Sequence, residues 1–257
     1  MQLTEFQWLM GCCAAMLVGF SKTGMPGVGI LVVPMLVFIF PGRLSTGAML
    51  PMLLFADVFA VIWYSKHTRW DKLWGLIPWV LAGFVMGTVL FLNVGPKKPN
   101  HKDIMDIIIG AIVLVMLGLH LLRQKMGDKL TPHSSTAVIA TGCAAGFTTM
   151  VSNAAGPVMT LYLQGMGMSK EQFIGTSAWF FFLVNLSKLP VYIALNSLRP
   201  ETPMITAHSL LFNLYMMPVI LLGVLIGKWL LPRIPQKTFD AAVLILAGIA
   251  ALKLVAG

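Results

Sequence analysis

The stretch Gly19–Pro34, GFSKTGMPGVGILVVP, decides how the chain is interpreted, because it interrupts two apolar runs with glycines and the charged residue Lys22. A second stretch, Gly146–Leu161 (GFTTMVSNAAGPVMTL), aligns with the first without a gap, at a constant numbering offset of 127. The aligned pairs are Gly146 over Gly19, Phe147 over Phe20, Thr148 over Ser21 and Gly156 over Gly29. We interpret the two interruptions as halves of one site.

Composition predicts a membrane protein. The 257 residues are 58% hydrophobic and 11% charged, with a mean hydropathy of +0.85, whereas a soluble domain carries about 25% charged residues. The apolar runs recur from end to end and are continuous rather than alternating, which disfavours a β-barrel. Because the N-terminus MQLTEFQW has no basic region, Met1–Phe20 is interpreted as a first membrane segment rather than a cleaved signal peptide. We expect an all-α membrane protein.

Ten apolar segments fall into two sets of five. The first set covers Phe6–Phe20, Val28–Phe40, Ser45–Tyr64, Leu73–Val94 and Ile104–Leu122, and the second covers Thr136–Val151, Gly156–Met168, Phe173–Leu195, Ala207–Leu231 and Phe239–Ala256. The first two segments of each set are shorter than the ~20 residues of a full span. Each short pair, separated at Ser21–Gly27 or Ser152–Ala155, is therefore a broken or re-entrant helix pair. The sequence predicts about 8–10 transmembrane segments.

Further matches extend the duplication beyond the two interruptions. They are Asn185 over Asp57 and Tyr192 over Tyr64 at an offset of 128, and Pro218 over Pro78, Gly223 over Gly83 and Gly227 over Gly87 at an offset of 140. We expect an N-terminal repeat over 1–122, a polar linker over 123–135 and a C-terminal repeat over 136–257. Because five is an odd number, the second repeat starts on the opposite side of the membrane, and inverted repeats with interrupted segments are typical of secondary transporters.

Charge gives a weaker signal about orientation and partners. The net charge of +9 favours the approach of anions, while basic residues scattered over separate loops argue against a nucleic-acid partner. Nine loop lysines and arginines fall on one side of the predicted topology and six on the other. The positive-inside rule then places both termini outside.

The interruptions carry most of the candidate binding residues. Interrupted backbone at membrane depth is tolerated only against protein or a wet cavity, and helix N-termini that face such a cavity suit an anion. Glycines let backbone approach a ligand, although close helix packing alone would also explain them. We expect substrate contacts from Thr23, Gly24, Gly27, Gly29, Ser152, Asn153 and Gly156.

Four further polar residues lie within apolar segments. A lysine at membrane depth costs about 2.5–3.5 kcal/mol, so Lys22 requires a counter-charge, water or an anionic ligand, unless it extends to the interface. Asp57 either pairs with a lysine or binds a coupling proton. Asn185 is its uncharged counterpart, and Lys188, at i+3 from Asn185, faces nearly the same way and is a second candidate anion contact or an interfacial lysine.

Several other functions lack their motifs. Cys12, Cys13 and Cys143 all lie in apolar runs without a CxxC or Cys/His spacing, so we expect no metal and no organic cofactor. No HExxH motif, Walker motif or catalytic Ser/His/Asp pattern supports an enzyme. The spacing of Gly83 and Gly87, GxxxG, allows close helix contact and would permit a homodimer.

The segments KTGMPGVGILVVP at Lys22–Pro34 and SNAAGPVMTLYL at Ser152–Leu163 resemble the paired repeat motifs of the TauE/SafE sulfite exporter family, also called the 4-toluene sulfonate uptake permease family. The resemblance implies a secondary transporter of sulfite or of an organosulfonate such as sulfoacetate in the bacterial inner membrane. We expect alternating access with coupling at Asp57. The alternatives are a carrier or channel for another anion, and an accessory subunit of a membrane complex.

Overall fold

The computed structural model describes residues 3–24, 28–40, 42–95, 103–126, 135–164, 166 and 168–230, and within these ranges every regular element is a helix. The first half contains α1 (Glu5–Thr23), η1 (Val28–Leu31), α2 (Val32–Ile39), α3 (Arg43–Tyr64), η2 (Ser65–His67), α4 (Trp70–Trp74), α5 (Ile77–Asn93) and α6 (Ile104–Met126). The second half contains α7 (Ser135–Ser152), α8 (Gly156–Gln164), α9 (Lys170–Leu198) and α10 (Ala207–Leu230). The predicted last segment, Phe239–Ala256, lies outside the described residues.

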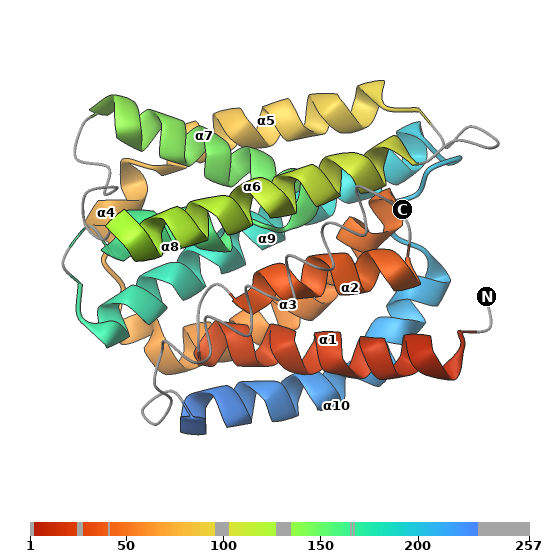
Figure 1. Cartoon of the computed structure of the whole chain (residues 1–257), viewed down its shortest axis with the longest axis horizontal. Helices are drawn as coiled ribbons and strands as arrows, with labels where there is room; N and C mark the ends of the chain where they lie inside the picture. Colours follow the sequence, from red (N-terminus) through yellow and green to blue (C-terminus); the bar gives the residue numbers. More distant parts are fainter. Residues whose placement is uncertain are drawn as a thin grey trace.

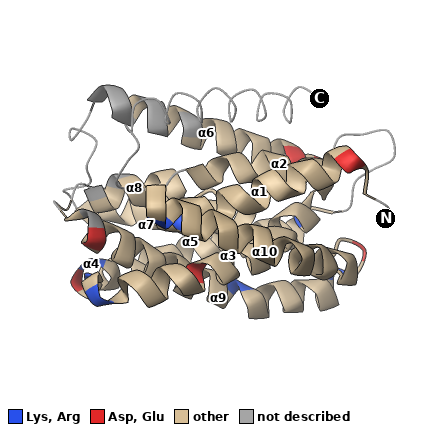
Figure 2. Cartoon of the chain, turned by 90° about the horizontal axis from the view of Figure 1, so that it is seen from below, with Lys and Arg blue, Asp and Glu red and all other residues tan. Residues whose placement is uncertain are grey.

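The helices are apolar enough for a multi-pass membrane protein. In the part of the chain that the structure describes, four are long enough to cross a bilayer: Arg43–His67, Ser135–Ser152, Glu171–Leu198 and Ala207–Leu230. Shorter apolar helices cover Val28–Ile39, Ile77–Asn93 and Ile104–Met116. In Figure 2 most of the ribbon is tan, so charged residues are few along the helices. The prediction of an all-α membrane protein is confirmed, with four long apolar helices and several shorter ones.

Helix boundaries differ from the predicted segments at several places. Helix α1 continues through Ser21 and Lys22 to Thr23, so the first interruption begins later than predicted. Helix α6 likewise continues to Met126, inside the predicted linker. The predicted segment Leu73–Val94 is divided, because α4 ends at Trp74. Helix α5 then starts at Ile77 with a proline in its first turn, where the missing N–H removes no helical hydrogen bond.

Two helix pairs flank the molecule. Figure 1 shows α1 beside α10 at one edge and α5 beside α7 at the opposite edge. In the first pair, a Cβ added to Gly19 would overlap the carbonyl oxygen of Ile220, and one added to Gly223 would overlap that of Met16. Glycines therefore set the separation of these two backbones.

The second pair is equally close. A Cβ on Gly83 would overlap the carbonyl oxygen of Cys143, one on Gly146 would overlap that of Val80, and Gly87 lies against Met150. Because α7 of the same chain buries Gly83 and Gly87, this surface is not available for the homodimer that the GxxxG spacing would permit. That expectation is corrected.

Helices α3 and α9 lie in contact between the two flanking pairs. Gly47 of α3 packs against the carbonyl of Met204, and Gly175 of α9 packs against the carbonyl of Tyr64. The polar residues that both helices carry midway along their length are consequently brought together in the interior.

Candidate functional site

A chain of polar side chains crosses the interior from α1 to α9. The ammonium nitrogen of Lys22 lies 2.8 Å from Asp57 Oδ1. The Asn185 amide donates to Asp57 Oδ2 at 2.7 Å and accepts from Lys188 Nζ at 2.9 Å. Asp57 and Lys188 are fully buried, whereas the Lys22 side chain is 11% exposed. Residues from three helices thus form one hydrogen-bonded unit.

Lys188 has no proton left for another partner in this arrangement. Its ammonium donates to Thr149 Oγ1 at 2.8 Å, to Asn153 Oδ1 at 2.7 Å and to Asn185 Oδ1 at 2.9 Å. Because an ammonium has three N–H donors, these contacts use all of them. Lys188 therefore holds α9 against the end of α7.

Lys22 has a different environment. Its nitrogen lies 4.4 Å from the centre of the Phe181 ring, in addition to its ion pair with Asp57. Phe181 and Lys22 both line an internal cavity of about 50 Å³. The residues around the cavity are Ser21, Lys22, Gly29, Ile30, Met49, Leu53, Thr149, Asn153, Ala154, Gly156, Pro157, Ile174, Ser177, Ala178, Phe181 and Asn185.

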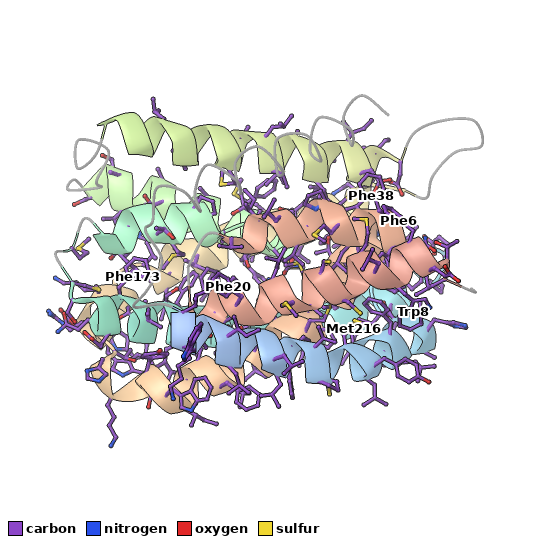
Figure 3. The ribbon with its side chains drawn as sticks, turned by 60° about the horizontal axis from the view of Figure 1, so that its bottom comes forward. Phe6, Trp8, Phe20, Phe38, Phe173 and Met216 are labelled. Atoms are coloured by element: carbon purple, nitrogen blue, oxygen red, sulfur yellow. The ribbon has the colours of Figure 1, made fainter. Side chains whose placement is uncertain are left out.

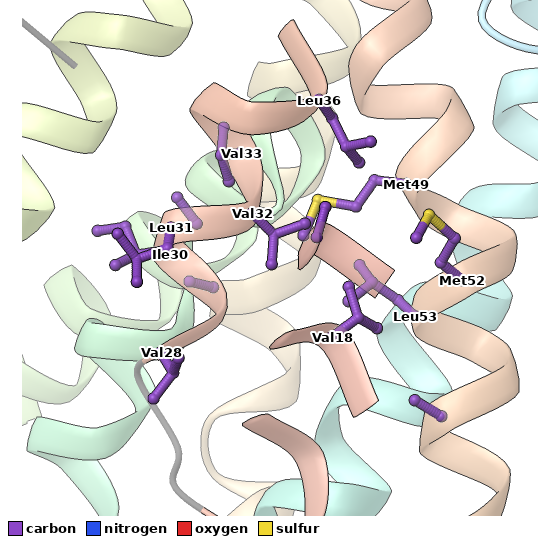
Figure 4. Packing of buried hydrophobic residues seen from close by; sticks show 14 of the residues in the cluster. Val18, Val28, Ile30, Leu31, Val32, Val33, Leu36, Met49, Met52 and Leu53 are labelled. Atoms are coloured by element: carbon purple, nitrogen blue, oxygen red, sulfur yellow. The ribbon is translucent and has the colours of Figure 1, made fainter. Parts of the chain in front are cut away.

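The cavity lies where both interruptions meet. Residues on either side of the first interruption come from α1 and η1, and those of the second come from the end of α7 and the start of α8. Figure 4 shows Val28 and Ile30 just after the first interruption, with Met49 and Leu53 of α3 across from them. The two interruptions, far apart in sequence, therefore face one space.

The predicted site residues are divided between the cavity and helix packing. Lys22, Gly29, Asn153, Gly156 and Asn185 line the cavity, and Asp57 and Lys188 are bonded to residues that do.

The remaining predicted residues have other roles in the structure. Thr23 donates to the carbonyl oxygen of Val224 at 2.7 Å, and Gly24 packs against Gly227, so both serve the contact of α1 with α10. Ser152 donates to the Thr148 carbonyl within its own helix. Gly27 lies outside the described residues.

Eleven of the sixteen cavity residues were not predicted from sequence, among them Thr149, Ser177 and Phe181. Thr149 is aligned with Lys22 in the gap-free alignment of the two interruptions, so that alignment already placed it at the equivalent position. Ser177 and Phe181 correspond to Met49 and Leu53, which also line the cavity, at the same offset that relates Asn185 to Asp57. The sequence of α9 by itself did not indicate Ser177 and Phe181 as site residues, because serine and phenylalanine are common in apolar segments.

The charges of this unit do not balance. The unit contains two lysines, Lys22 and Lys188, and one carboxyl group, Asp57, so with all three ionised it carries a formal excess of one positive charge. Burying an uncompensated ion costs several kcal/mol. A single negative charge in the cavity would lower that cost, so the arrangement favours an anion. The described residues contain no group of three or more His, Cys, Asp or Glu that could hold a metal ion.

Comparison with known proteins identifies the family to which the chain belongs. The chain matches the sulfite exporter TauE/SafE family over residues 11–254, which is nearly its whole length. No curated protein and no solved structure matches it. Members of this family are membrane transporters and not enzymes, in agreement with a multi-pass helical structure that contains a cavity lined in part by Lys22. The chain belongs to the sulfite exporter TauE/SafE family of membrane transporters.

Proposed function

We propose that the protein is a secondary transporter that moves a small sulfur-containing anion, sulfite or an organosulfonate such as sulfoacetate, across the bacterial inner membrane by alternating access. Family membership supports the transport of such anions. The observation that carries the proposal is the position of Lys22, which lines a cavity between the two interruptions. No cofactor is required.

The bound anion would contact Lys22 first. Lys22 is the lysine of the polar unit that lines the cavity, whereas Lys188 is saturated by neutral acceptors and positions Thr149 and Asn153. Hydroxyl groups of Thr149 and Ser177 and the backbone at Gly29 and Gly156 complete the proposed site. A charged contact of this kind is typically worth about 1.5–3 kcal/mol.

Asp57 would couple transport to protons. Asp57 and the anion compete for the same ammonium, since Lys22 Nζ lies 2.8 Å from Asp57 Oδ1 in the unliganded site. Protonation of Asp57 would release Lys22 for the anion, and deprotonation would displace the anion. The anion and the proton would then move together.

The two halves would be inverted repeats that exchange roles during transport. Matching contacts support this. Gly19 lies against Ile220 and Gly146 against Val80, and these two contacts are related by the offsets of 127 and 140 that the sequence repeats show. Gly47 lies against Met204 and Gly175 against Tyr64, which are related by the offsets of 128 and 140. Each half thus packs its first and third α-helices on the other half at matching positions.

Orientation follows from loop charge. Nine basic loop residues against six favour a periplasmic location for both termini. Reaction of a cysteine introduced at Thr4 with an impermeant thiol reagent in intact cells tests this part of the proposal.

Substrate class is tested by ligand-induced stabilisation. Purified protein is heated with sulfite, sulfoacetate, an aromatic sulfonate, thiosulfate or a carboxylate, because a ligand that binds the native state raises its apparent stability. We expect sulfite or sulfoacetate to raise the melting temperature and the carboxylate to leave it unchanged. Stabilisation by the carboxylate alone would indicate a carrier for another anion. Flux in liposomes that does not saturate would indicate a channel, and binding without flux would indicate an accessory subunit.

A further inference from the structure

The cavity is lined by matching positions of α3 and α9, but it extends further along α9. Met49 and Leu53 of α3 line it together with their counterparts on α9, Ser177 and Phe181. On α9 the lining continues to Ile174 and Ala178. All four residues are buried, at 0–4% exposure, but the corresponding α3 residues, Thr46 and Leu50, do not line the cavity. The cavity is therefore longer toward the start of α9 than toward the start of α3.

These two starts lie at opposite ends of the molecule. Figure 3 shows Phe173, near the start of α9, at one end, and Phe38, shortly before α3, with Phe6 at the other end. We call them the Phe173 end and the Phe38 end. The lining residues reach toward the Phe173 end.

At the Phe38 side of the cavity, Thr46 is tied to the second interruption. Its hydroxyl donates to the Val151 carbonyl oxygen at 2.9 Å, and its own carbonyl accepts from the Asn153 amide at 3.0 Å. Asn153 has a φ of 56°, a conformation uncommon for a non-glycine residue, and Lys188 donates to its side chain at 2.7 Å. We name the hydrogen bonds among Thr46, Val151 and Asn153 the Thr46 clasp.

The matching position on the other side cannot form the same clasp. Ile174, the counterpart of Thr46 on α9, has no hydroxyl group and lines the cavity instead. The Thr46 clasp on one side of the cavity therefore corresponds to the apolar side chain of Ile174 on the other side. At this matched pair of positions, the hydrogen-bonded residue is on the Phe38 side and the cavity-lining residue is on the Phe173 side.

We propose that the cavity is reached from the Phe173 end, past Ile174 and Ala178, and that the Thr46 clasp is the closed gate on the Phe38 side. The proposal rests on the alternating-access function proposed above. When the gate opens, Thr46 and Leu50 line the cavity, while Ile174 and Ala178 no longer do.

Single cysteines test the gate. Cys12, Cys13 and Cys143 are first replaced by alanine, and then Thr46→Cys, Leu50→Cys, Ile174→Cys and Ala178→Cys are made one at a time. Membrane vesicles of known orientation are treated with an impermeant thiol reagent, without substrate. We expect cysteines at 174 and 178 to react from one side only, and the cysteine at 50 to react at least about tenfold more slowly from either side, as expected for a site that opens only when a conformation costing more than about 1.4 kcal/mol is populated. Equal reaction at all four positions, or faster reaction at 50 than at 178, would overturn the proposal.

Loss of the clasp hydroxyl gives an independent readout. Thr46→Val removes the bond to Val151 with little change of shape, so Leu50→Cys should react about fivefold faster in that background, which corresponds to one hydrogen bond of about 1 kcal/mol. Thr46→Ser should restore slow reaction. Thr148→Val is the matched control, because the Thr148 hydroxyl donates to Ala144 within its own helix.

Neither experiment depends on the identity of the anion. If sulfite and sulfoacetate are not transported but the labelling pattern holds, the proposed substrate is wrong and the gate stands. If transport is found and Thr46→Val behaves like Thr148→Val, the gate is wrong and the proposed function stands. Size-exclusion chromatography of each variant checks that it is folded. If Thr46→Val is not folded, Thr46→Ser is compared with Thr148→Val instead.

Discussion

At the scale of single residues, the two buried lysines have different tasks although both were candidate anion contacts. Lys22 has one carboxylate partner and borders the cavity, whereas Lys188 has three neutral acceptors and no free proton. The distinction depends on which side chains of α7 meet α9. Helical spacing predicted that Asn185 and Lys188 share a face, but it contained nothing about Thr149 or Asn153, which come from another part of the chain.

Replacing Lys22 separates binding from stability. Lys22→Gln leaves Asp57 buried without its partner, so we expect about 3–5 kcal/mol of destabilisation, while the double variant Lys22→Gln with Asp57→Asn should recover most of it. Both variants should bind anion at least about tenfold more weakly, since each lacks the ammonium. Denaturation and binding of the purified proteins measure the two effects. If the double variant bound the anion as tightly as the wild type, Lys22 would not be an anion-binding residue.

Lys188 is expected to matter for folding instead. Lys188→Met leaves acceptors on Thr149, Asn153 and Asn185 without a donor, which should destabilise the protein by about 3 kcal/mol, given about 1–3 kcal/mol for each unsatisfied buried group. Lys228→Met is the control, because Lys228 is an exposed lysine 4.0 Å from the Trp63 ring, a contact worth about 0.5–1 kcal/mol. Equal melting temperatures for the two variants would contradict this role.

At the scale of helices, the sequence predicted the elements better than their ends. Apolar length predicted the described helices, and glycine spacing indicated close packing. The first interruption was placed too early, because glycine and serine were assumed to end α1 at Phe20, whereas Ser21 bonds back to the Val18 carbonyl and remains helical. Packing partners could not be predicted, since Gly83 and Gly87 fit a second copy of the chain as well as α7.

Close packing gives a test that applies to both halves. Gly83→Ala and Gly223→Ala each place a Cβ into a carbonyl oxygen, of Cys143 and of Met16, and should destabilise the protein by about 1–3 kcal/mol each. Gly75→Ala is the control, because nothing lies within 4 Å of its added Cβ. Chemical denaturation in detergent compares them. Similar losses are expected in both halves if they are repeats, and a loss confined to one half would argue against equivalence.

At the scale of the whole molecule, coupling and alternating access join the polar unit to movement of the two halves. Asp57, from α3, is the acid of that unit, and it contacts both Lys22 of α1 and Asn185 of α9. A proton bound there changes the charge balance at the centre of the protein. The pH dependence of transport therefore reports on this residue.

The pH profile distinguishes Asp57 from a loop acid. We expect Asp57→Asn to abolish the variation of transport rate with pH. Asp71, in α4, accepts hydrogen bonds from Arg69 that hold its pKa at about 2, so it stays ionised throughout the range tested and Asp71→Asn should leave the profile unchanged. Rates of anion uptake by liposomes from pH 5 to 8 make the comparison. A wild-type profile in Asp57→Asn would end the coupling proposal.

The central claim is that one anion binds beside Lys22 in the cavity between the two interruptions. Its most direct test is counterflow of radiolabelled sulfite in liposomes that contain either the wild type or the Lys22→Gln, Asp57→Asn double variant. We predict transient accumulation of label with the wild type and accumulation no greater than in protein-free liposomes with the folded double variant. Equal accumulation by both proteins would contradict the account.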